Sequence, residues 1–185
     1  MNHIDISPQT AMRRALGIGL LAALLALGTA APAVLAAITC PGGSCFGTDG
    51  DDTLQGTAGV DHITGFGGAD TISGFAGNDM LTGDEQLDFR RDGADTISGG
   101  DGNDELTGFG GADLLVGGRG ADIIDAQEVA DHPPGKDTVR GGRGNDTIYA
   151  ADGVKDVIDC GSGRDIVYFD PGLDKVANCE MKTPV

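Results

Sequence analysis

The chain has 185 residues, of which 33 are glycine and 4 % are aromatic, and its formal net charge is -17. Glycine makes up about 7 % of a typical globular domain, so this composition does not suit a conventional core built from large side chains. The acidic charge argues against nucleic acid and anionic lipid as partners, because both require patches of lysine and arginine. Cations and basic partners remain.

Residues 1–36 are predicted to form a secretory signal peptide. Arg13 and Arg14 precede the apolar run ALGIGLLAALLALGTAA, and Val34 and Ala36 stand at the small-residue positions that a signal peptidase prefers. The alternative is a membrane anchor, but glycines and a proline interrupt the run, which falls short of about 20 strongly apolar residues. We therefore expect a secreted, extracellular protein that has no membrane anchor after cleavage, exported by the Sec or the Tat route.

Nine-residue units fill most of the remaining chain, as expected of a repeat protein. Ten units are regular: GTDGDDTLQ (47–55), GTAGVDHIT (56–64), GFGGADTIS (65–73), GFAGNDMLT (74–82), GGDGNDELT (99–107), GFGGADLLV (108–116), GGRGADIID (117–125), GGRGNDTIY (141–149), CGSGRDIVY (160–168) and FDPGLDKVA (169–177). Three more units, 83–98, 126–140 and 150–159, carry extra residues. Together they make 13 units.

Three positions of the unit do not vary in kind. The fourth is glycine, at Gly50, Gly59, Gly68, Gly77, Gly93, Gly102, Gly111, Gly120, Gly135, Gly144, Gly153, Gly163 and Gly172. The sixth is aspartate, at Asp52, Asp61, Asp70, Asp79, Asp95, Asp104, Asp113, Asp122, Asp137, Asp146, Asp156, Asp165 and Asp174. The eighth is always leucine, isoleucine or valine.

Each position has a physical meaning. Glycine permits a positive φ and a close backbone approach in a turn. The last three residues of a unit, such as Thr71 to Ser73, alternate polar, apolar and polar, which indicates a short strand with one buried side chain. A single unit cannot bury that side chain alone, whereas stacked units can, in parallel ladders about 4.8 Å apart.

The predicted fold is therefore all-β, a right-handed parallel β-roll or β-solenoid of about 13 repeats over residues 47–177. Residues 37–46 would form an N-terminal cap and residues 178–185 a C-terminal cap or tail. With two units in each coil, unit n lies over unit n+2, and Ile63, Ile72 and Leu81 face inward. The aspartates then form one file along each edge of the roll. Carboxylates about 5 Å apart repel by roughly 3 kcal/mol at an effective dielectric constant near 20, so each file needs neutralisation.

The tandem nonapeptide closely resembles the RTX (haemolysin-type calcium-binding) repeat, over about residues 47–177. This resemblance implies that Ca²⁺ is held between stacked turns by the 13 aspartates at position six and by backbone carbonyls of the glycine-rich positions. Calcium suits such a site because it accepts six to eight oxygens in loose geometry, whereas zinc prefers His or Cys. The alternative is that each aspartate only caps its own turn.

The chain departs from the family pattern at position two, where glycine occurs only at Gly100, Gly118, Gly142 and Gly161. Phenylalanine takes this position at Phe66, Phe75 and Phe109. We expect these rings to bulge the turn outward or to cover an ion, so the phenylalanine turns are the weakest candidates for calcium. Stacked in two rows, the 13 turns leave six plus five intervals between neighbouring turns, and these intervals are the largest number of calcium sites that the roll could offer.

The four cysteines, Cys40, Cys45, Cys160 and Cys179, lie at the two ends of the mature chain. An even number behind a signal peptide suggests disulfides. Register places Cys160 over residue 178, so we expect a Cys160–Cys179 bridge that fastens the tail. Cys45 falls at position eight of a degenerate unit and is expected to pair with Cys40. The alternative for each pair is two free thiols.

No catalytic motif of the HExxH or GxSxG type occurs in the sequence, and we predict that the protein is not an enzyme. The favoured function is a secreted protein that folds on binding Ca²⁺. An alternative is an adhesion or ice-binding module that uses calcium only as scaffold, with Thr53, Thr71 and Thr96 aligned on one sheet. A further alternative is a polysaccharide-processing enzyme on a β-helix. It would need clustered acidic, basic and aromatic residues on an outer face, and the sequence shows no such cluster. The sequence does not identify a protein or glycan partner.

Overall fold

A computed structural model describes residues 37–84, 92–127 and 135–185. These residues belong to one compact unit that extends to Val185. The predicted signal peptide, and most of the extra residues of units 83–98 and 126–140, lie outside the described residues. Within the described ranges, no helix is long and apolar enough to cross a membrane.

Sixteen short strands make up the described chain. They are β1 (Ile38–Thr39), β2 (Gly43–Phe46), β3 (Thr53–Gln55), β4 (Asp61–Thr64), β5 (Thr71–Ala76), β6 (Met80–Thr82), β7 (Thr96–Asp101), β8 (Glu105–Thr107), β9 (Leu114–Arg119), β10 (Ile123–Asp125), β11 (Thr138–Arg143), β12 (Thr147–Ala150), β13 (Val157–Ser162), β14 (Ile166–Phe169), β15 (Lys175–Ala177) and β16 (Met181–Pro184).

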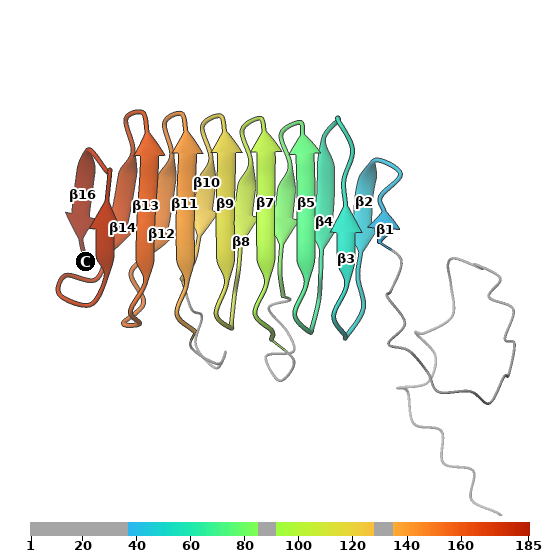
Figure 1. Ribbon diagram of the computed structural model, residues 1–185, viewed down its shortest axis with the longest axis horizontal. Helices are drawn as coiled ribbons and strands as arrows, with labels where there is room; N and C mark the ends of the chain where they lie inside the picture. The colour runs from blue at the N-terminus through green and yellow to red at the C-terminus, as the bar shows by residue number, and fades with distance from the viewer. Residues whose placement is uncertain (1–36, 85–91, 128–134) are drawn as a thin grey trace, which may run out of the picture. The chain divides into compact units, whose positions relative to one another are not determined.

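The strands form two parallel sheets of eight, one from the odd-numbered and one from the even-numbered strands (Figure 1). Each strand between the sheet ends pairs with the strand two places before it and the strand two places after it in the sequence. Ile72, for example, lies between Leu54 and Ile97 in the odd sheet. The predicted parallel β-roll, with unit n over unit n+2, is therefore confirmed.

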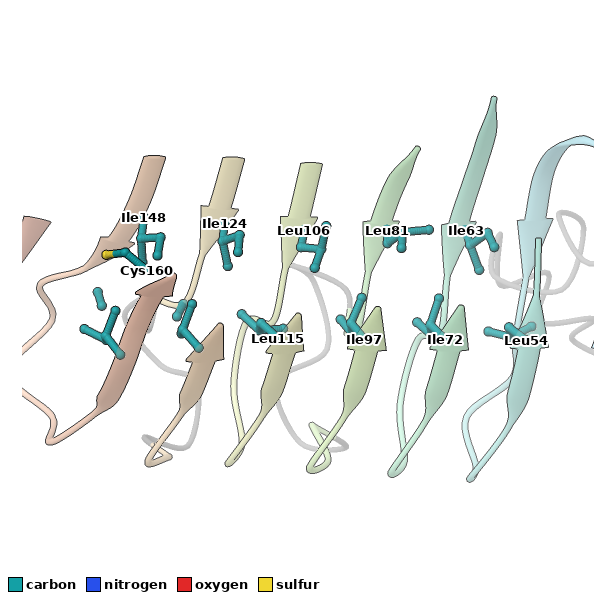
Figure 2. Close-up of a cluster of buried hydrophobic side chains, with 14 of the residues drawn as sticks. Leu54, Ile63, Ile72, Leu81, Ile97, Leu106, Leu115, Ile124, Ile148 and Cys160 are labelled. Atoms are coloured by element: carbon teal, nitrogen blue, oxygen red, sulfur yellow. The ribbon is translucent and has the colours of Figure 1, made fainter. Parts of the chain in front are cut away.

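The core is a double file of aliphatic side chains from position eight. They point toward one another from the two sheets, as Figure 2 shows for Leu54, Ile72, Ile97 and Leu115 facing Ile63, Leu81, Leu106 and Ile124. All twelve position-eight side chains from Leu54 to Val167 are at most 1 % exposed. Because each unit contributes only this one large side chain, the roll has a thin core that depends on its edges.

The roll is longer than the repeat region predicted from the sequence. β1 pairs with β3, β2 pairs with β4, and β16 pairs with β14. Cys45 lies opposite Ile63, in the buried slot expected of position eight. The disulfides Cys40–Cys45 and Cys160–Cys179 are both present, as predicted. The segments expected to be caps thus contribute strands of their own.

The two edges of the roll differ in regularity. We call the turns that lead into odd strands the odd edge; their described residues are 47–52, 65–70, 83–84 with 92–95, 108–113, 126–127 with 135–137, 150–156 and 169–174. The turns that lead into even strands form the even edge (56–61, 74–79, 99–104, 117–122, 141–146, 160–165 and the tail turn 178–180). All three units with extra residues lie on the odd edge, so only the even edge repeats every turn without insertion up to the tail.

Candidate metal centres

The aspartates at position six form two buried files, one along each edge. Asp174 is half-buried, and the other twelve are at most 3 % exposed: Asp52, Asp61, Asp70, Asp79, Asp95, Asp104, Asp113, Asp122, Asp137, Asp146, Asp156 and Asp165. Each stands directly before a strand or, at Asp61, begins one, so the parallel pairing of the strands brings equivalent carboxylates onto successive rungs. The structure therefore brings the predicted aspartates together as two files and not as one cluster.

Hydrogen bonds link neighbouring aspartates within each file. The backbone N–H of one aspartate donates to Oδ1 of the aspartate on the next rung, at 2.7 Å from Asp52 to Asp70 and 3.0 Å from Asp122 to Asp146. On the odd edge these bonds run through Asp52, Asp70, Asp95, Asp113, Asp137, Asp156 and Asp174. On the even edge they run through Asp61, Asp79, Asp104, Asp122, Asp146 and Asp165.

The second carboxylate oxygen is in a different situation. Within the described part of the chain, buried Oδ2 atoms have no hydrogen-bond donor at Asp70, Asp79, Asp95, Asp104, Asp113, Asp122, Asp146, Asp156 and Asp165. A buried charged oxygen without a partner is costly, because it loses its hydration and gains nothing in return. A row of such oxygens along each edge is suited to bind cations.

The pKa values of these carboxyls are raised for the same reason. Burial is the largest cause, and it raises the pKa of Asp95 to about 7 and that of Asp113 to about 9. The hydrogen bond to Oδ1 lowers the pKa, but neighbouring carboxylates of the file raise it again. Burial likewise raises the pKa of Asp122 to about 7 and that of Asp70 to about 6.

Glycine at position one makes room for the carboxylate. A Cβ built on Gly117 would lie 2.5 Å from Asp122 Oδ2 and 2.6 Å from the carbonyl oxygen of Gly141 on the next rung. The carboxylate of a turn and a backbone carbonyl of its neighbour therefore converge on the same open side of this glycine. This is an all-oxygen donor set of the kind that calcium prefers.

In the ten regular units, the backbone conformation at position two separates two kinds of turn. At Gly100, Gly118, Gly142 and Gly161, φ is between 100° and 119°, in the left-handed region. Thr48, Thr57 and Asp170 hold the same position without a positive φ, and their backbone N–H groups donate to Oδ2 of the aspartate four residues later, at 2.6 to 2.7 Å. We call turns with this bond closed, and turns whose Oδ2 has no donor among the described residues open.

The phenylalanines at position two do not close their turns. Phe66, Phe75 and Phe109 adopt φ values of 77°, 74° and 64°, which is the conformation of the glycines at this position. The aspartates of these three turns are among those whose Oδ2 has no donor in the described chain. The turns that differ are the closed ones, the first on each edge and the last on the odd edge, and not the phenylalanine turns that the sequence singled out.

The glycines at position four serve two different needs. Nine have φ between 88° and 151°: Gly68, Gly77, Gly102, Gly111, Gly120, Gly144, Gly153, Gly163 and Gly172. The other four, Gly50, Gly59, Gly93 and Gly135, do not have a positive φ. At Gly93 and Gly135 the need is close approach, since a Cβ would collide with the carbonyl of the previous rung. The predicted turn conformation therefore holds at most of these positions but not at all.

Two acidic residues join the files although the motif does not include them. Asp84 is fully buried and accepts a hydrogen bond from the N–H of Gly93 at 3.2 Å, and burial followed by the charges of Asp95 and Asp92 raises its pKa to about 9. Glu180 accepts the N–H of Asp165 at 2.9 Å, in place of a further aspartate. For Asp84, the available signal in the sequence was its place directly after Gly83, at position two of the motif, where the family pattern has glycine.

Among the residues that the structure describes, no group of three or more His, Cys, Asp or Glu side chains is placed to hold a metal ion. A site must therefore combine carboxylates with backbone carbonyls. The family model of the RTX calcium-binding nonapeptide repeat matches the chain in four copies, over residues 46–81, 67–89, 91–124 and 134–167. The chain belongs to the RTX repeat family. No curated protein matches the chain significantly.

The RTX match agrees with the geometry of both edges. The matched residues include open turns of the odd and of the even edge, and RTX repeats typically bind Ca²⁺. The buried oxygens without donors fit that ion, because calcium replaces its hydration shell with carboxylate and carbonyl oxygens. In this RTX chain the residues that would hold the ions are the aspartates of the open turns.

The phenylalanine turns provide a test of the left-handed position. A non-glycine residue in this conformation costs about 1–2 kcal/mol, and glycine gives back about 0.5–1 kcal/mol through its greater freedom when unfolded. Phe75 is 53 % exposed, so Phe75→Gly should raise the stability of the calcium-loaded protein by about 0.5–1 kcal/mol. Guanidinium unfolding in saturating calcium measures this change.

The matched variant is Phe66→Gly. The ring of Phe66 stacks on Phe46 with centroids 5.8 Å apart, and losing such a pair costs about 0.5–1.5 kcal/mol. Phe66→Gly should therefore gain less stability than Phe75→Gly, or lose some. A greater loss of stability from Phe75→Gly than from Phe66→Gly would contradict this account of position two.

The raised pKa values predict how the metal-free chain responds to pH. The folded-state pKa values of about 7 for Asp95 and about 9 for Asp113 exceed the ordinary value of about 3.9. Folding therefore binds protons, so the stability that these groups contribute is present below about pH 4 and is lost as the pH rises through 7 and 9. Far-UV circular dichroism of the chain in metal-stripped buffer should show more β-structure at pH 4 than at pH 8. A β signal that grows with pH would show that the buried carboxyls do not control folding.

Proposed function

We propose that this protein is secreted, binds several Ca²⁺ ions in its open turns, and folds as a consequence of binding them. The observation that carries the proposal is the row of buried Oδ2 atoms without hydrogen-bond donors, among the described residues, along both edges. Each ion would take carboxylate oxygens from neighbouring aspartates of one file and carbonyl oxygens from the turns. Magnesium fits less well, because it requires a tight octahedron and keeps its water.

The coupling of folding to calcium follows from the balance of forces in the roll. The core contributes one aliphatic side chain from each unit, whereas each folded turn buries a carboxylate beside another one. Without cations this burial works against folding, and with cations the binding free energy becomes folding free energy. A ligand that binds only the folded chain stabilises it further as its concentration rises. Millimolar calcium outside the cell would then favour the folded roll.

The proposed location rests on the disulfides and on the family. The bonds Cys40–Cys45 and Cys160–Cys179 account for all four cysteines. Disulfides persist in oxidising compartments such as the extracellular space, and RTX repeat proteins are generally secreted. The signal peptide over residues 1–36 remains a prediction from the sequence.

We further propose that the protein acts by binding and not as an enzyme, which a screen for hydrolase activity would test. The alternative of an adhesion or ice-binding module has one supporting observation. Thr53, Thr71 and Thr96 pair in register on the odd sheet, although Leu114 follows them in the same file. Thermal hysteresis or cell-binding measurements would distinguish this alternative.

Calcium-dependent folding is tested by circular dichroism of the mature chain in EDTA and then in increasing Ca²⁺. We expect a disordered spectrum in EDTA and a cooperative gain of β-structure with calcium. Asp104→Asn removes a charge from an open turn of the even edge and should raise the calcium concentration at the midpoint by several-fold, since affinity depends on the number of charged ligands.

The control variant is Asp101→Asn, three residues away and with the same change of charge. Asp101 points to solvent, where it pairs with Arg119 at 3.2 Å with both side chains more than 60 % exposed. The midpoint of this variant should stay close to that of the unmodified protein. A β-rich spectrum in EDTA that calcium does not change would overturn the coupling of folding to calcium.

A further inference from the structure

The carboxylate file of the even edge continues past the last aspartate of the repeats into the C-terminal tail. β16 pairs with β14, with Met181 opposite Ile166. The N–H of Met181 donates to the carbonyl of Asp165 at 2.9 Å, and the N–H of Asp165 donates to Glu180 Oε2 at 2.9 Å. The rung before has the same two bonds, from Ile166 to Asp146 and from Asp146 to Asp165. Glu180 therefore occupies the place of the next aspartate.

The tail reaches this place by a shorter path than the repeats. Only residues 178–180 separate Ala177 from Met181, whereas residues 160–165 separate their partners on the rung before, Asp159 and Ile166. The side chain of glutamate is one methylene longer than that of aspartate and compensates for the missing residues. Cys179, next to Glu180, is bonded to Cys160, the first residue of the turn that carries Asp165. The disulfide thus holds Glu180 over Asp165.

Asp165, the last aspartate of the even edge, lies next to Glu180. Its side chain is fully buried, and its Oδ2 has no hydrogen-bond donor in the described residues. Burial is the main cause that raises the pKa of Asp165, and the adjacent carboxyl of Glu180 raises it further. Two carboxyl groups lie side by side here, and one of them is deeply buried.

The end of the odd edge provides a contrast within the same molecule. Asp174 is the last carboxylate of that file, and both of its oxygens accept backbone N–H groups, from Asp156 at 2.9 Å and from Asp170 at 2.7 Å. Backbone donors thus satisfy the end of the odd edge. At the end of the even edge, the corresponding turn has a glutamate and a disulfide instead.

We propose that Asp165 and Glu180 form a calcium site that closes the C-terminal end of the even edge, with Glu180 as a carboxylate ligand outside the repeat motif. This inference rests on the proposed function. Glu180 is exposed and the tail turn is short, so the ion would complete its shell with water in addition to carbonyls of the turn 160–165. The site is therefore weaker than those between two full turns, and its ion fixes β16 onto the roll.

Calorimetric titration of Ca²⁺ into the full mature chain with both disulfides intact tests the site. Glu180→Gln should remove the weakest binding step or reduce its affinity about tenfold or more, since one charged ligand is lost. The remaining steps and the calcium-induced β signal should stay unchanged. Glu105→Gln is the matched control, because Glu105 is exposed on the outer face of β8 and changes the charge by the same amount.

Hydrogen exchange supplies a second readout that is local to the tail. In saturating calcium, the amides of Met181 and Val185, which bond to β14 and its preceding turn, should be protected in the unmodified protein. Glu180→Gln should lose this protection, and so should Glu180→Asp, whose side chain is too short for the three-residue turn. The amide of Thr147, in the middle of the even sheet, should stay protected in both variants.

The outcomes separate this inference from the proposed function. A chain that binds no calcium at all contradicts the proposed function. A chain that binds calcium, but whose Glu180→Gln and Glu180→Asp variants keep every binding step and the tail protection, overturns the Glu180 site alone. Collapse of the whole roll in either variant at saturating calcium would also overturn it, because the site belongs only to the last rung.

Discussion

The burial of like charges along both edges is the constraint on which this structure depends. Each rung of the roll buries one aliphatic side chain and one carboxylate, and the parallel stacking that aligns the first necessarily aligns the second. In the open turns, hydrogen bonds between rungs satisfy Oδ1 of the carboxylate and leave Oδ2 without a donor among the described residues. The core and the charge cannot be separated, since the same register creates both. Under the proposed function, cations bound along both edges would convert the least favourable feature of the fold into its main source of stability.

The local switch that prepares the turns for a cation is the backbone at position two. In the ten regular units, no N–H group of the turn reaches Oδ2 where this residue is left-handed, and where it is not, as at Thr48, its own N–H donates to Oδ2. The closed turns carry the first aspartate of each file and the last aspartate of the odd edge. Phe75, exposed yet left-handed, shows that this conformation is maintained even with a bulky side chain.

Much of this architecture could be predicted from the sequence because it follows from a strict period. The nine-residue repeat gives the register, and the register gives the core at Ile72, the files of aspartates, and the Cys160–Cys179 bond. What departs from the period could not be predicted. Glu180 reaches the file through a three-residue turn, and Asp84 joins it within a unit that carries an insertion. In the regular units, the distinction between open and closed turns follows a single φ angle, which the residue type at position two does not determine.

The most direct test of the central claim is a crystal structure of the calcium-loaded protein with anomalous diffraction data, which locates calcium ions. The account predicts anomalous peaks along both edges, each within about 2.3–2.6 Å of an aspartate Oδ2 of an open turn and of backbone carbonyl oxygens. Density for water alone at these oxygens, with calcium confined to the outer faces of the sheets, would contradict the account.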